Sequence, residues 1–337
     1  VELLKQDNDE FEKFLRNNSN EINHYEMLAD LYKHNNEFGN SKWFRYEKKE
    51  IIKGYVNRLR KGKITVNADN LTICGNPYAL LLYSVGEDWE SDKTLGDENG
   101  TIQCYTTRFE DNEFLCAFRN PHNSPNNILY LHNVYSEEMK KYFPFSDNIL
   151  AINCIKSDIQ DRANGCDEDS DFFFVTNQNT LVKYAKICYE EYPTIVNTLK
   201  ESNITYENTK ISYADMDNKF AKSRMSIGES SNLAQLAMTY YWTNPDNKEL
   251  YDNFVILSVL AQVAIDSCKR EYEVDPITEI ERIKKMDSMN LTKKIWNGEK
   301  YIKVRCDLPE FMKYTKEVKF MKNGKEIPYE EVKESKD

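Results

Sequence analysis

The chain has 337 residues, 40% of them apolar and 12% aromatic, so it can bury a large core. Its formal net charge of −11 argues against a surface that binds nucleic acid indiscriminately, because phosphate contacts need clustered Lys and Arg. The sequence holds no apolar run of about 18 residues, and its first residues lack the basic stretch and the cleavage site of a secretory signal. We therefore expect a globular cytoplasmic protein that spans no membrane.

Apolar residues in the segment 1–63 recur at steps of three and four, which predicts an N-terminal helical flank. Basic residues gather between Arg45 and Lys63, where eight Lys and Arg accompany only Glu47 and Glu50. Two interpretations stay open for this basic stripe. It is either a solvated helix face or a contact with a polynucleotide backbone.

From Ile64 onward, short apolar runs alternate with Asn, Asp, Gly and Pro, which is typical of β-structure. The predicted strands are Leu71–Cys74, Tyr78–Val85, Ile102–Phe109, Phe114–Phe118, Ile128–Val134, Asn148–Ile155 and Phe172–Thr176. Helices are predicted at Glu137–Phe143, with Ser136 as the N-cap, and from about Thr180 to Glu190.

Helical patterning returns in the remainder of the chain. Two apolar stripes, one around Leu233 and one around Leu257, predict a pair of long helices, and Asp275 followed by Pro276 predicts the start of a third. We therefore expect an α+β protein in three parts: a helical flank at 1–63, a β-rich domain at 64–190 and a C-terminal helical region at 191–337.

The cysteines and histidines carry no recognisable metal or nucleophile motif. The 8 Cys are scattered without a CxxC pair, and the 4 His form neither an HxxxH motif nor a Cys/His cluster. This distribution favours buried, reduced thiols over zinc ligands or a disulfide framework. Zinc chemistry and a Ser/His/Asp triad are disfavoured for the same reason.

One acidic stretch does have metal-ligand spacing. Asp167, Asp169 and Asp171 alternate with other side chains, so on an extended segment they project to one side and can converge on a hard cation. A calcium loop of the EF-hand type needs Gly and Glu where this chain has Phe172 and Gln178. The stretch is therefore either a solvated acidic turn or a magnesium site for phosphate chemistry.

A second motif, Arg119-Asn120-Pro121 with Pro125 and Ile128 after it, precedes the aspartates. Together the two motifs resemble the double-psi β-barrel RNA polymerases. They are most similar to the cellular RNA-dependent RNA polymerases of the RNA-silencing type and to related bacterial and phage single-chain polymerases, which carry Arg-Asn-Pro and then Gly-Gly-Asp-x-Asp-Gly-Asp. The segments starting at Ile227 and Leu260, the latter ending in Cys268-Lys269, are similar to segments that follow the barrel in those enzymes.

This resemblance implies a central double-psi β-barrel and a nucleotidyltransferase that adds nucleotides to an RNA 3′-hydroxyl with Mg²⁺ or Mn²⁺. Asp167, Asp169 and Asp171 would be the catalytic metal ligands, and Arg119 and Asn164 would bind the nucleotide substrate. A structural salt bridge is the alternative role that stays open for Arg119. Lys222 and Arg224, just before the long helices, would contact the template or product. The implied partners are nucleoside triphosphates and nucleic acid.

The chain departs from the family pattern at Cys166, Glu168 and Ser170, where the family has Gly, an apolar residue and Gly. Glu168 either points away from the metal or adds a fourth carboxylate to it. The complete enzymes also use two barrels, whereas this sequence has length for one. We therefore expect a fragment, a single-barrel protein, or one subunit that works with a second barrel-bearing chain.

Two alternatives to a polymerase remain. The first is a non-catalytic interaction or scaffold protein that retains the barrel. The second is a metal-dependent nuclease that uses the same aspartates, although no His or Lys stands beside them as a general base.

Overall fold

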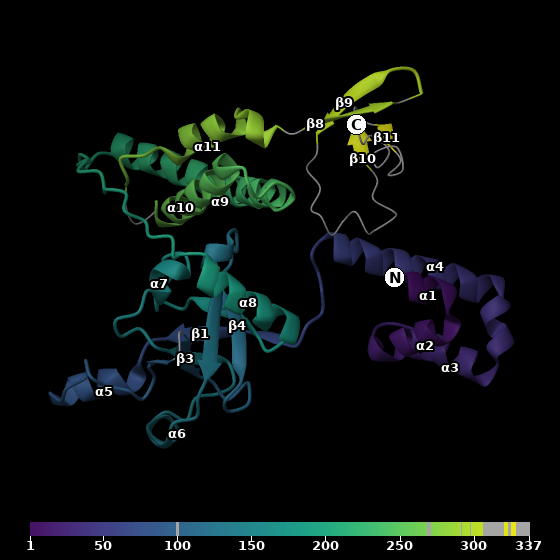
Figure 1. The fold of residues 1–337 in the computed structure, drawn as a ribbon, viewed down its shortest axis with the longest axis horizontal. Coiled ribbons are helices and arrows are strands. Elements are labelled where there is room, and N and C mark those ends of the chain that lie inside the picture. Colours follow the sequence, from purple (N-terminus) through teal and green to yellow (C-terminus); the bar gives the residue numbers. More distant parts are fainter. Residues whose placement is uncertain are drawn as a thin grey trace. The chain divides into compact units, whose positions relative to one another are not determined.

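The computed structural model describes residues 1–98, 101–267, 271–290, 292–296, 298–305, 320–322 and 325–327. These residues form two units (Figure 1). One unit holds Val1–Thr65 together with a hairpin of β10 (Phe320–Lys322) and β11 (Lys325–Ile327), and the other holds the described residues from Val66 to Arg305.

Helices build the first unit, as the sequence predicts. They are α1 (Glu2–Gln6), α2 (Asn8–Asn17), α3 (Tyr25–His34), the 3-10 helix η1 (Asn36–Asn40) and α4 (Lys42–Arg60). The side chain of Asp7 accepts hydrogen bonds from the first turn of α2, and Ser41 caps α4 in the same way. The helices bury a shared core that includes Phe11, Leu28 and Phe44.

Six strands of the second unit close into a barrel. The strands are β1 (Ala68–Cys74), β3 (Thr101–Tyr105), β4 (Phe114–Phe118), β5 (Leu129–Asn133), β6 (Ile149–Ile152) and β7 (Phe172–Thr176). Their order is β3-β5-β4-β7-β1-β6, and the pairing of β6 back onto β3 closes the ring. Pairs β1–β6 and β3–β5 are parallel and the other four are antiparallel. The short strand β2 (Asp97–Glu98) pairs with β3 in the antiparallel direction.

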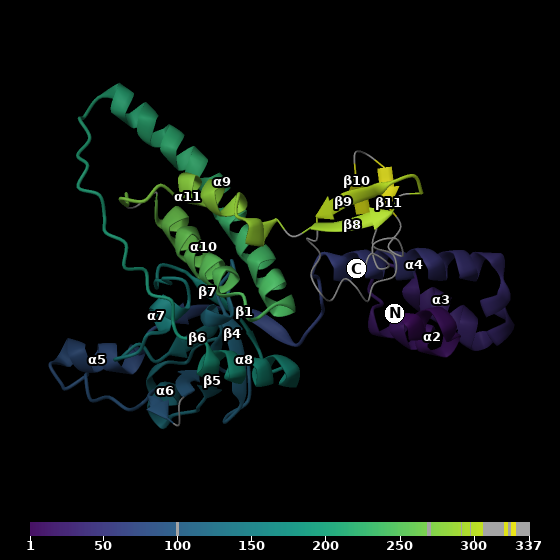
Figure 2. The ribbon, with the colours of Figure 1, turned by 45° about the horizontal axis from the view of Figure 1, so that its top comes forward.

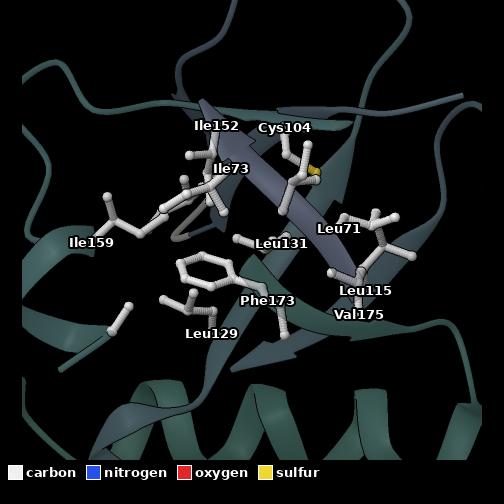
Figure 3. Packing of buried hydrophobic residues seen from close by; sticks show 14 of the residues in the cluster. Leu71, Ile73, Cys104, Leu115, Leu129, Leu131, Ile152, Ile159, Phe173 and Val175 are labelled. Atoms are coloured by element: carbon white, nitrogen blue, oxygen red, sulfur yellow. The ribbon is translucent and has the colours of Figure 1, made fainter. Parts of the chain in front are cut away.

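Alternate residues of the strands fill the barrel interior, which is the side-chain period of a strand. Figure 3 shows the ring of Phe173 lying among side chains from several strands. Leu71, Leu115, Leu129 and Leu131 in this core are all completely buried. The predicted α+β class with a central barrel is therefore confirmed.

Helix α8 (Asn179–Glu191) packs against β4 and β5. Between the strands lie α5 (Pro77–Val85), α6 (Glu137–Tyr142), α7 (Ile159–Arg162) and the 3-10 turn η2 (Pro125–Asn127). Ser136 caps α6 through the backbone N–H of Met139, as predicted. The predicted strand Tyr78–Val85 is wrong, because Pro77 starts a helix there and Gly86, at φ 80°, ends it.

Two long helices pack side by side in Figures 1 and 2: α9 (Lys210–Thr243) and α10 (Lys248–Asp266). They bury an apolar seam with α11 (Pro276–Lys284), which Asp275 caps as predicted. The 3-10 turn η3 (Asp287–Met289) and a hairpin of β8 (Thr292–Trp296) and β9 (Tyr301–Arg305) follow, and the sequence did not predict this hairpin. None of the described helices is both long and apolar enough to cross a membrane.

The buried guanidinium of Arg162, the last residue of α7, connects the segment before β5 with the end of α8. Arg162 is 3% exposed and donates hydrogen bonds from Nε to the carbonyl of Ile128 (2.7 Å), from Nη1 to that of Tyr192 (3.1 Å) and from Nη2 to that of Cys188 (3.0 Å). The guanidinium also stacks on the ring of Tyr189 at 4.4 Å. Arg162 thus links the loop after β4 to the end of α8.

We expect Arg162→Met to lower the free energy of unfolding by about 3 kcal/mol, because three carbonyls would lose their donor inside the protein. Arg108→Met is the matched control, because Arg108 pairs with Asp69 at the surface and its loss should cost less than about 1 kcal/mol. Urea unfolding followed by circular dichroism measures both. Equal losses in the two variants would show that the buried contacts of Arg162 are not important for stability.

Candidate metal centre

Asp167, Asp169 and Asp171 converge in the loop between α7 and β7. One ligand oxygen from each lies within 4.8 Å of the others. Asp169 is exposed to solvent, and Asp171 is half-buried at the start of β7. Three carboxylate oxygens this close together can share one hard cation and leave open positions for water or substrate.

The backbone of this loop uses conformations that favour Gly. Asn164 and Gly165 enter it in the left-handed region at φ 58° and 64°, and Ser170 has φ 106°. An L-residue other than Asn or Gly is strained at such angles. The turn between the last two aspartates has a positive φ at Ser170, which explains why Gly would suit this position and why Ser is strained there.

Arg119, directly after β4, forms an ion pair with Asp171 of the aspartate cluster. Its Nη2 lies 2.8 Å from each carboxylate oxygen of Asp171, and the two side chains are only 15% and 17% exposed. Its Nη1 donates to the carbonyl of Asn164 at 3.1 Å. Asp171 also accepts a hydrogen bond from the backbone N–H of Asp167 at 3.0 Å. These donors offset part of the repulsion among the three carboxylates.

Asn164 is buried next to this ion pair. Its Nδ2 donates to the carbonyl of Pro121 at 3.2 Å, which joins the Asp loop to the Arg119 segment. Its Oδ1 is buried and has no hydrogen-bond partner among the described residues. A buried acceptor without a donor is costly, and a ligand would reach this oxygen only if the side chain of Asn164 moved.

Glu168 points away from the three aspartates. Its Oε1 lies 3.8 Å from Sγ of Cys154, and a Cβ built on Gly75 would come within 2.6 Å of the same oxygen. Its carboxylate thus lines a separate cavity of about 810 Å³. The other walls of this cavity include Cys74, Pro77, Leu80, Tyr83 and Trp89. Gly75 leaves room for the carboxylate of Glu168. The sequence does not predict this role, because no local pattern shows that a carboxylate approaches Gly75.

The thiols around the loop stay protonated at neutral pH. Burial raises the pKa of Cys166 to about 12 and that of Cys154 to about 12, and it raises the pKa of Cys74 to about 11. The carboxylate of Glu168 adds to the shift at each of them. Burial thus disfavours the thiolate form that ligates a metal, and the candidate ligands are the oxygens of the three aspartates.

The loop that carries Arg119 also contacts the paired helices. Within it, Asn123 is completely buried and accepts a hydrogen bond from Oγ of Ser258 on α10 at 3.2 Å. Movement of α10 would therefore act on the segment that positions Arg119.

The prediction that Lys222 and Arg224 precede the long helices is wrong. They are exposed residues inside α9, which already begins at Lys210. No contact among the described residues joins them to the aspartates. Cys268 and Lys269, which contributed to the resemblance, lie outside the described residues.

Sequence comparisons do not assign the chain to a family, since no family model and no curated protein matches it. Among solved structures, it is similar to the RNA-dependent RNA polymerase QDE-1 from Thielavia terrestris, with a TM-score of 0.47 and 14% sequence identity. That match covers 86% of this chain and 33% of the polymerase chain. The chain therefore spans about one third of the length of that polymerase.

The coupling free energy between Arg119 and Asp171 can be measured with a double-mutant cycle of Arg119→Gln and Asp171→Asn. We expect a coupling free energy of about 2 kcal/mol, because both groups are largely removed from water. The matched cycle at Arg108 and Asp69, whose side chains are 30% and 53% exposed, should give less than about 1 kcal/mol. A coupling near zero at Arg119 and Asp171 would contradict the assigned role of the pair.

His122 makes the fold sensitive to acid. Burial lowers its pKa to about 4, whereas an unfolded His titrates near about 6.5. The unfolded state therefore takes up the proton first, so the contribution of His122 to stability is present above about pH 6.5 and is lost as the pH falls toward about 4.

We expect the free energy of unfolding to fall by less in His122→Gln than in the wild type between about pH 7 and about pH 5. The difference should be about 2 kcal/mol, and urea unfolding at the two pH values measures it. His132→Gln is the control, because it removes another histidine of the barrel and leaves His122 in place. Parallel losses in all three proteins would rule out His122 as the group responsible.

Proposed function

We propose that this chain is the catalytic-barrel portion of an RNA polymerase-like nucleotidyltransferase. The observation that carries the proposal is the convergence of the three aspartates within 4.8 Å, with the guanidinium of Arg119 at the same loop. Polymerases need carboxylates so arranged, because phosphoryl transfer places much negative charge at the reacting phosphate.

The donor set fits Mg²⁺ or Mn²⁺. The candidate ligands are carboxylate oxygens, which these hard cations prefer, and the neighbouring thiols stay protonated. Asp169 is exposed, so a cation held here would keep water ligands, as Mg²⁺ commonly does. Bound divalent metal would activate the 3′-hydroxyl and neutralise charge on the triphosphate.

The chain's own residues would orient the reactants. Arg119 holds the carboxylate of Asp171 in place and keeps further N–H donors, since a guanidinium has five, for the sugar or phosphate of a nucleotide. Asn164 would accept a hydrogen bond from a sugar hydroxyl through its unpaired Oδ1 once the side chain moves to expose that atom. Lys222 and Arg224 on α9 remain candidates for contact with template or product backbone.

The proposed reaction would need more than this barrel. The described residues form one closed barrel, and the chain spans about one third of the similar polymerase. We infer that cations for the triphosphate come from another part of the protein or from a partner chain that carries a second barrel. Nucleoside triphosphates and a nucleic acid would be the ligands of the assembled site.

The metal site is tested first, by Mn²⁺ titration followed by electron paramagnetic resonance. We expect Asp169→Asn to weaken Mn²⁺ binding by at least about tenfold, because one of three charged ligands is lost. Asp161→Asn, which removes an exposed carboxylate from α7, is the control and should bind like the wild type. Equal binding by all three proteins would exclude the aspartate cluster as the site.

Nucleotide addition is tested with the same proteins by extension of an RNA primer in Mn²⁺. A product that Asp169→Asn loses by at least about 100-fold and Asp161→Asn retains would support the proposal. Equal signals from wild type and Asp169→Asn would overturn it. Intact Mn²⁺ binding with no extension by any variant would favour the alternative of a non-catalytic scaffold that retains the barrel.

A further inference from the structure

One face of α4 carries exposed basic side chains in a continuous row. Lys42, Arg45, Lys49 and Lys53 follow at steps of three and four residues, which places them on one side of the helix, and all four are exposed. Tyr46 lies on the same side and is 61% exposed. We call these five residues the α4 basic face.

The other charged residues near this row have partners inside the first unit. Lys48 is 9% exposed and donates to Oδ1 of Asn8 at 2.7 Å, so it belongs to the helical core rather than to the face. Glu47 lies 3.0 Å from the ring of His24. Glu50 lies 3.5 Å from Lys53, but both side chains are about half exposed and the pair is screened by water.

Helix stability does not explain the basic face. The first turn of α4 contains no acidic residue, and Lys42 and Arg45 lie near its N-terminus, where the helix dipole disfavours positive charge. Like charges three and four residues apart also repel one another. Arg58, by contrast, lies near the C-terminus, where the dipole favours a cation. A bound polyanion would remove both unfavourable terms.

We propose that the α4 basic face binds the phosphate backbone of a single-stranded nucleic acid, with Tyr46 stacked on a base. The row from Lys42 to Lys53 spans 11 helical steps of about 1.5 Å, or about 16 Å, which is enough for several phosphates. The exposed ring of Tyr46 favours an unpaired base over a duplex. The choice of nucleic acid over an acidic protein rests on the proposed function.

The test measures binding of fluorescein-labelled oligo(U), about 20 nucleotides long, to the full chain by fluorescence anisotropy. EDTA is present throughout, so the readout does not depend on metal at the aspartates. The face variant combines Lys42→Gln, Lys49→Gln and Lys53→Gln. Its control combines Lys140→Gln, Lys183→Gln and Lys186→Gln, three exposed lysines of α6 and α8. Each set changes the net charge from −11 to −14, which is −11 minus 3.

We expect the face variant to bind at least about tenfold more weakly than the control variant and to lower the salt slope of binding by about 2. Tyr46→Ala should weaken binding by about fivefold without changing the salt slope. Circular dichroism checks that each variant stays folded. Equal affinities of the face and control variants would overturn the proposal.

Two further outcomes separate this proposal from others. If poly-glutamate binds the wild type but not the face variant, and oligo(U) binds neither, the face recognises an acidic protein and the nucleic-acid assignment is wrong. If the wild type binds oligo(U) more tightly than the face variant but extends no primer, the result counts against the proposed function and not against the α4 basic face.

Discussion

Three carboxylates that converge on one point repel one another, and the aspartate loop depends on how that repulsion is offset. Asp171 receives the guanidinium of Arg119 and the backbone N–H of Asp167, and Asp169 is exposed to solvent. The positive φ angles of Asn164, Gly165 and Ser170 fold the loop around these contacts. The site thus combines a backbone that is strained at Ser170 with three carboxylates held close together, and a divalent cation would offset the negative charge of those carboxylates.

The barrel supplies the frame that makes this arrangement possible. Strands β4 and β7 are antiparallel neighbours in which Phe118 pairs with Phe174, so the end of one strand lies beside the start of the other. Arg119 follows β4 and Asp171 precedes β7, and the strand register therefore brings them together. Arg162 and the contact from Ser258 to Asn123 then tie this end of the barrel to the surrounding helices.

The departures from the polymerase pattern have separate structural consequences. Cys166 fills a place in the barrel core, where burial keeps its thiol protonated. Glu168 lines its own cavity beside Gly75, so it does not compete with the aspartates for a cation. Ser170 is the one departure with a conformational cost, since its φ of 106° suits Gly better. None of the three removes a carboxylate from the cluster.

The sequence by itself determined most of the local structure and the chemistry of the candidate site. The apolar run Phe172–Thr176 and the caps Ser136 and Asp275 act within a few residues, so they could be predicted. The run Tyr78–Val85 was misjudged, because an apolar stretch without clear periodicity suits either a strand or a helix. Only the tertiary structure decided the closure of β6 on β3, the meeting of Arg119 with Asp171 and the direction of Glu168. Those contacts join residues far apart in the chain, and their geometry follows from strand register and packing rather than from any local pattern.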